Sequence, residues 1–111
     1  MYRKPLTKTA TIASGESTSD VIRTRDYALM GLIFPATMTS TSLAIHVCGT
    51  PDGTYVPCHD ADDNPVGIPV TAGEARGLSA AEADAVAPFQ FLKLVGNDTE
   101  TGARAIGVAL K

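Results

Sequence analysis

Apolar and polar residues alternate along most of the chain, in short runs separated by turn residues. In the run 43–48, Leu43, Ile45 and Val47 fall on one face, while Ala44, His46 and Cys48 fall on the other. Because successive side chains of a strand point to opposite faces, this pattern predicts a half-buried strand. Similar runs predict further strands at 7–13, 21–24, 27–34, 66–70, 89–95 and 103–110.

A turn signal follows the central run, in the tetrapeptide Thr50-Pro51-Asp52-Gly53. Pro51 presets φ at about −65°, and we expect Gly53 to adopt a left-handed φ that a residue with a Cβ resists. With strands ending at Gly49 and resuming at Thr54, the sequence predicts a β-hairpin with a loop of three to five residues.

One stretch is typical of a helix, residues 79–86. Ser79 and Glu82 have the spacing of a capping box, the stretch is rich in alanine, and Pro88 ends it. About eight short strands and this crossover helix predict an all-β fold, a two-sheet antiparallel β-sandwich that is jelly-roll-like. Pro69 predicts an edge strand. We expect residues 1–6 to form an N-terminal arm and residues 7–111 a single domain.

Composition narrows the possible partners. The 111 residues carry a net charge of −3, and the nine basic residues are scattered. Nucleic-acid binding needs a basic patch, so we expect no nucleic-acid partner. No apolar run approaches the length that spans a bilayer, and no secretory signal follows Met1, so we expect no membrane role and synthesis in a reducing cytoplasm.

Two cysteines and two histidines could form a zinc set by residue type: His46, Cys48, Cys58 and His59. Their spacing matches none of the usual finger spacings, and His59 falls on the opposite face by alternation. The hairpin register also pairs Cys48 with residues near 55 or 56, which leaves Cys58 offset along its strand. We therefore expect free thiols and no zinc.

The acidic turn has the opening of a calcium loop, because Asp60, Asp62 and Asn64 lie two residues apart. Pro65 stands where the sharp bend needs glycine, and Thr71 stands where the bidentate glutamate belongs. A solvated turn without a metal is the expectation.

Motifs for catalysis are missing from the sequence. It contains neither Gly-x-Ser-x-Gly nor a phosphate-binding loop, so we expect no enzyme, no catalytic residues and no cofactor. Sandwich modules that bind sugars usually stack exposed aromatic rings on them. This chain has no Trp, and its three Phe residues fall in strand patterns that are expected to pack.

Several motifs follow one another in an order that resembles a family of small bacteriophage virion structural proteins. They are Gly15-x-Ser17-x-Ser19, Leu-Met-Gly-Leu-Ile-Phe-Pro-Ala at 29–36, Met-Thr-Ser-Thr-Ser-Leu at 38–43, Thr-Pro-Asp-Gly-Thr-Tyr at 50–55, and Pro-Phe-Gln-Phe-Leu-Lys-Leu-Val at 88–95. The resemblance implies a capsid decoration (cement) protein on the virion surface. Its implied partners are the major capsid protein and copies of itself, in a homo-oligomer such as a trimer. A tail or head–tail component and a glycan- or host-binding sandwich module remain alternatives.

Overall fold

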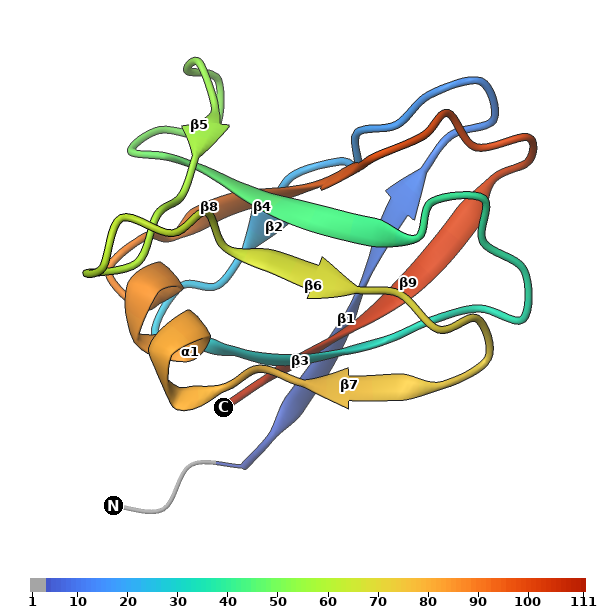
Figure 1. The fold of residues 1–111 in the computed structure, drawn as a ribbon. Helices are drawn as coiled ribbons and strands as arrows, with labels where there is room; N and C mark the ends of the chain where they lie inside the picture. Colours follow the sequence, from blue (N-terminus) through green and yellow to red (C-terminus); the bar gives the residue numbers. More distant parts are fainter. Residues whose placement is uncertain (1–3) are drawn as a thin grey trace.

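The fold is a sandwich of two antiparallel sheets, seen in a computed structural model that describes residues 4–111 (Figure 1). Over this range the chain forms nine strands and one helix. Their bounds are β1 Leu6–Ile12, β2 Ile22–Arg23, β3 Leu29–Ile33, β4 Ser42–Cys48, β5 Val56–Pro57, β6 Gly67–Pro69, β7 Ala75–Gly77, α1 Ala80–Val86, β8 Phe91–Gly96 and β9 Arg104–Leu110.

The first sheet has the order β1-β9-β3-β7, and the second has the order β2-β8-β4-β5 with β6 also paired to β4. Every strand pairing is antiparallel. The predicted two-sheet sandwich is therefore confirmed. Figure 1 looks between the sheets from the side of β6 and β7, with the first sheet below and the second above.

The core fills the space between the sheets. Leu43, Ile45 and Val47 point inward from β4, as their alternation predicted. The largest inward side chains of β8 and β9 are also fully buried, namely Leu92, Leu94, Ile106 and Leu110. Each side chain of this size contributes about 1.5–3 kcal/mol by leaving water, so the core supplies most of the driving force for the fold.

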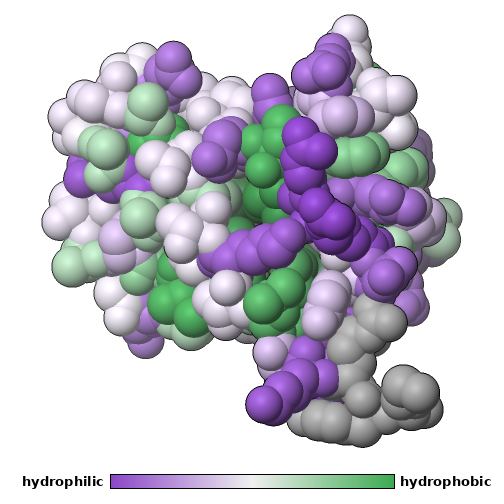
Figure 2. All heavy atoms as spheres, turned by 180° about the vertical axis from the view of Figure 1, so that it is seen from behind, coloured by the Kyte–Doolittle hydropathy of each residue, from purple (hydrophilic) through white to green (hydrophobic). Residues whose placement is uncertain are grey.

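On the far side of the sandwich, the edges β1 and β2 leave the core partly open. Figure 2 shows this side, with hydrophobic residues at its centre and hydrophilic side chains lying across them. Lys8 occupies an inward position on β1, and its Nζ donates a hydrogen bond to the Arg23 carbonyl oxygen of β2 at 3.0 Å. Its alkyl stem thus covers apolar surface while its charge reaches a polar partner.

The helix α1 joins the two sheets on the other open side. The Ser79 hydroxyl accepts from the Glu82 N–H at 3.2 Å, and the Glu82 carboxylate accepts from the Ser79 N–H at 2.8 Å. The capping box and the crossover helix are therefore confirmed. Ala83 and Val86 turn inward from the helix, and Val86 joins the core.

The hairpin after β4 differs from the prediction. Val47 pairs with Val56, so residues 49–55 form a longer loop than the expected three to five residues. Gly53 lacks the expected left-handed φ; its N–H contacts the Thr50 carbonyl oxygen at 3.5 Å as the fourth residue of the turn. The longer loop is closed by the Tyr55 hydroxyl, which donates to the Pro51 carbonyl oxygen at 2.9 Å. Glycine suits the last turn position without a positive φ.

Two short strands, β5 and β6, share one edge of β4. Ile45 receives a hydrogen bond from the Cys58 N–H and donates its own N–H to Val66, at 3.0 and 3.1 Å. Because Cys58 and Val66 are themselves hydrogen-bonded at 2.9 Å, residues 59–65 project from the edge as a side loop. Pro69 lies in the edge strand β6, which confirms its predicted place.

Other boundaries differ slightly from the prediction. β1 begins at Leu6, which was expected in the arm, because Leu6 pairs with Leu110. The rest of the predicted arm lies mostly outside the described residues, since only Lys4 and Pro5 are described. The strand β7 was not predicted; its three residues are all exposed, so no alternation marks it.

Left-handed backbone occurs instead at Gly15 and Gly73, with φ of 83° and 77°. A Cβ at Gly73 would meet no atom within 4 Å, and the same holds for Gly67, whose φ is not positive. Gly73→Ala should therefore lower the free energy of unfolding by about 1–2 kcal/mol through backbone strain alone. Gly67→Ala is the matched control and should be neutral or slightly stabilising. Chemical denaturation measures both, and equal effects would contradict the assignment.

Candidate functional site

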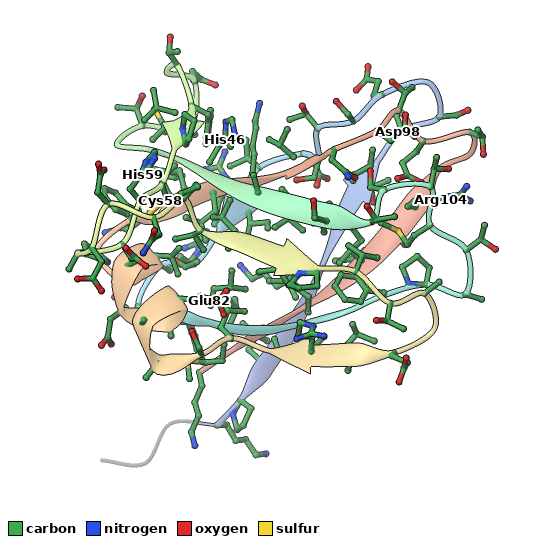
Figure 3. All side chains as sticks on the ribbon, viewed as in Figure 1. His46, Cys58, His59, Glu82, Asp98 and Arg104 are labelled. Atoms are coloured by element: carbon green, nitrogen blue, oxygen red, sulfur yellow. The ribbon has the colours of Figure 1, made fainter. Side chains whose placement is uncertain are left out.

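The histidines and cysteines weighed as zinc ligands do not converge. Cys58 is buried and His59 is exposed, while His46 lies on the outer face of β4 (Figure 3). Cys48 lies on the same outer face of β4 as His46. Burial lowers the pKa of His46, which favours the neutral ring. Within residues 4–111, no three His, Cys, Asp or Glu side chains are grouped so that they could hold a metal.

Both cysteines are free thiols. The Cys58 N–H donates a hydrogen bond to the carbonyl oxygen of Ile45, which lies three positions from Cys48 along β4. The register offset that argued against a disulfide is therefore present. The Cys58 thiol donates to the Ala85 carbonyl oxygen of α1 at 3.5 Å. Burial, and to a lesser degree the Asp60 carboxylate, raises the pKa of this thiol and makes it less reactive.

The acidic turn at 60–64 is closed by its own hydrogen bonds. One oxygen of Asp60 accepts from the N–H groups of Asp62 and Asn64, each at 2.9 Å. Beside α1, the turn borders an open hollow of about 290 Å³ with Asp84 on its far side. The arrangement is that of a solvated turn whose backbone is satisfied locally.

Aromatic rings on the outer face of the second sheet are paired with cations. The Lys93 ammonium lies 4.6 Å from the centre of the Tyr55 ring, and the Arg23 guanidinium lies 5.8 Å from the centre of the Phe91 ring. Cations over both rings occupy the surface on which a sugar would stack. The expectation that all three Phe residues pack is wrong for two of them, because Phe89 is exposed and Phe91 is half-buried on the outer face of β8.

A buried carboxylate, Glu100, lies at the end of the sandwich where Figure 3 labels Asp98 and its partner Arg104. Its side chain has 0% exposure and accepts three hydrogen bonds. Two come from the N–H groups of Thr39 and Ser40 at 2.9 and 2.8 Å, and the third comes from Arg104 Nε at 2.8 Å. The carboxylate therefore joins the β3–β4 loop to the β8–β9 loop.

The backbone of the same residue secures a third loop. The Glu100 carbonyl accepts from the Gly15 N–H at 2.8 Å, and the Glu100 N–H donates to the Glu16 carbonyl at 2.9 Å. Sequence reasoning missed this site, because Glu100 belongs to no motif and its partners Thr39 and Ser40 lie far away in the sequence. Arg104, four residues later, was the one signal of a partner.

Burial alone would raise the pKa of Glu100. The three hydrogen bonds outweigh that effect and lower its pKa from 4.5 to about 2. The carboxylate is therefore ionised at neutral pH and holds the three loops in one arrangement. This is a structural role, because it fixes the arrangement of the loops at this end of the sandwich.

The broadest distinctive surface is the outer face of the first sheet. The pairing register places uncharged residues at ten outward positions of its four strands, and Met30, exposed at the bulge of β3, is uncharged as well. We call this surface the neutral face; it comprises Thr7, Thr9 and Thr11 of β1, Ala105, Gly107 and Ala109 of β9, Gly31 and Ile33 of β3, and Ala75 and Gly77 of β7. Outer faces of antiparallel sheets usually carry polar and charged residues, so this composition indicates an interaction surface.

The fold defines the class of this protein as a small two-sheet β-sandwich. Its architecture is similar to that of the crystal structure of the SPBc2 prophage-derived protein YomS, with a TM-score of 0.60 and 9% sequence identity. The similarity covers 99% of this chain and 96% of the other. No protein-family model matches the sequence, and no curated protein matches it. In the part of the chain that the structure describes, no helix is long and apolar enough to cross a membrane.

Glu100→Gln should lower the free energy of unfolding by about 2–3 kcal/mol at neutral pH, because the amide nitrogen cannot accept hydrogen bonds from backbone N–H groups. Glu16→Gln, at an exposed site in the neighbouring loop, is the control and should change stability by less than about 0.5 kcal/mol.

The pH dependence of this difference follows from the low folded pKa. The stabilisation is complete above about pH 4.5 and is lost as the pH falls through about 2, below which Glu100 is protonated in both states. Urea unfolding across this range should show wild type and Glu100→Gln converging in acid. A constant difference would mean that the charge of Glu100 is not the cause.

Thiol labelling should distinguish the two cysteines. Without reductant, the folded protein should show one rapidly reacting thiol, Cys48, and the unfolded protein should show two, because only Cys58 is buried. Cys48→Ser should remove the rapid phase. Fewer than two thiols after unfolding, or one zinc ion per chain by elemental analysis, would contradict this assignment.

Proposed function

We propose that this chain is a bacteriophage virion structural protein that decorates the head shell, with the major capsid protein as its partner. The observation that carries the proposal is the similarity in fold to a prophage-derived protein, which covers 99% of this chain and 96% of the other. The order of sequence motifs supports the same class. The finer assignment to the head shell rests on the family that those motifs resemble.

The physical character of the chain suits a decoration protein. Three loops at one end are held together by Glu100, so the surface that they form needs little ordering on binding. The low pKa of Glu100 keeps that surface intact in mildly acidic surroundings. A protein that works outside the cell on a virion benefits from such a preformed surface.

Decoration proteins stabilise a shell by binding only its assembled form, and the stabilisation follows mass action. At a free concentration of about 100 times Kd, each occupied site gains about 2.7 kcal/mol. Copies linked as a homo-oligomer bind several capsid subunits at once and multiply weak contacts through avidity. We therefore propose a homo-oligomer at the capsid surface.

The test uses shells of the phage that encodes the chain, prepared without this protein. Added purified protein should bind assembled shells in a fixed ratio and raise their resistance to heat, whereas disassembled capsid protein, the control, should bind none. Cryo-electron microscopy should then place it on the outer surface. Finding the chain only in tails, or shells whose stability does not change, would overturn the head-shell assignment.

A further inference from the structure

The neutral face is uncovered in the single chain. We infer that it is the contact surface of a twofold-symmetric pair, in which the neutral faces of two copies of this chain stack on each other. This inference does not depend on the head-shell assignment, and it identifies which surface the copies share.

The charges of this sheet are placed away from its outer face. Lys8 and Arg104 occupy inward positions on β1 and β9, where Lys8 contacts the Arg23 carbonyl and Arg104 contacts Glu100. Arg76 occupies an inward register position at the exposed edge β7, opposite Leu32. Basic side chains thus lie at the margins between the sheets, and the outward surface that usually carries charge carries none.

A second copy is the occupant that best explains this absence. In a twofold contact a residue near the axis meets its own copy, so a charged residue there would face a like charge. A different partner protein could offer the opposite charge, and such a face would have no reason to exclude charges altogether. A twofold self-contact therefore favours uncharged residues near its axis, and the ten positions of the neutral face carry no charge wherever on it the axis falls.

The shape of the face is also self-complementary. The Ile33 side chain is 47% exposed and lies over Gly107. A Cβ added at Gly107 would come within 3.0 Å of the Ile33 Cβ. Beside it is an open hollow of about 330 Å³, and its lining includes Met30, Gly31, Ala75, Gly77 and the edge residue Arg76. A twofold axis between the two features would seat the Ile33 side chain of each copy in the hollow of the other.

The edges of the sheet favour stacking over strand addition. An inward charge on an edge strand is a known protection against pairing with another chain, and Lys8 provides it on β1. The opposite edge, β7, has only three residues. Two copies therefore meet through the face of the sheet and not through its edges.

The size of the face predicts a weak contact. Four strands about 4.8 Å apart, up to seven residues long at about 3.4 Å each, present roughly 400 Å² per copy. A standard stable interface buries about 800 Å² per partner. We therefore expect a Kd of about 0.1–1 mM, which gives pairs where copies are concentrated and monomers in dilute solution.

The experiment compares wild type with Ile33→Lys and Val56→Lys by sedimentation equilibrium up to about 2 mM protein. Val56 is the matched control, because it is a β-branched residue with 51% exposure on the other sheet. Wild type and Val56→Lys should show the same monomer–dimer equilibrium. Ile33→Lys should raise Kd at least about tenfold, since it places like charges near the axis.

A salt series and a second variant on the neutral face complete the test. The wild-type Kd should be nearly unchanged between about 0.05 and 0.5 M salt, because a neutral contact is not screened. Ala105→Lys, at another exposed position of the same face, should also raise Kd, which would show that the loss in Ile33→Lys is not a local packing defect. A monomer at about 2 mM, a trimer, strong salt dependence, or equal loss in Val56→Lys would each overturn the inference.

Discussion

One buried carboxylate determines the shape of an entire end of this sandwich. Glu100 accepts hydrogen bonds from the β3–β4 loop and from Arg104, while its backbone secures the β1–β2 loop. Loops of a sandwich are the parts with the greatest freedom, because few of their backbone groups belong to the sheet ladders. Here the freedom of three loops is removed by the need to satisfy one ionised group.

The positions of the basic residues in the first sheet follow from the same need of a charged group for a polar partner. The sandwich places Lys8 and Arg104 between its sheets, where each finds an oxygen partner, and leaves the outer face of one sheet without charge. Inward charges on edge strands prevent chains from adding to the sheet indefinitely. An inward charge at an edge and an uncharged outer face are thus two separate features of the same sheet.

Sequence patterns predicted the parts of the fold that depend on neighbouring residues. The alternation at 43–48 and the pair Ser79 and Glu82 predicted β4 and α1 correctly, because period and capping are local. The left-handed φ predicted for Gly53 was wrong, and the exposed strand β7 was missed. Loop length and edge pairing depend on distant segments, which a local pattern does not show. Glu100 was missed for the same reason: its partners Thr39 and Ser40 lie some 60 residues away. The neutral face emerged only once the register between strands was known.

The side loop at 59–65 gives the molecule a place where its length can change. It leaves and rejoins the edge of β4 between β5 and β6, and the hydrogen bond between Cys58 and Val66 closes its base. Residues added at the tip would lengthen a closed loop without shifting either strand, and the entropic cost of a longer loop grows slowly. The loop is therefore a suitable graft point for displaying a foreign peptide on the surface of this small sandwich.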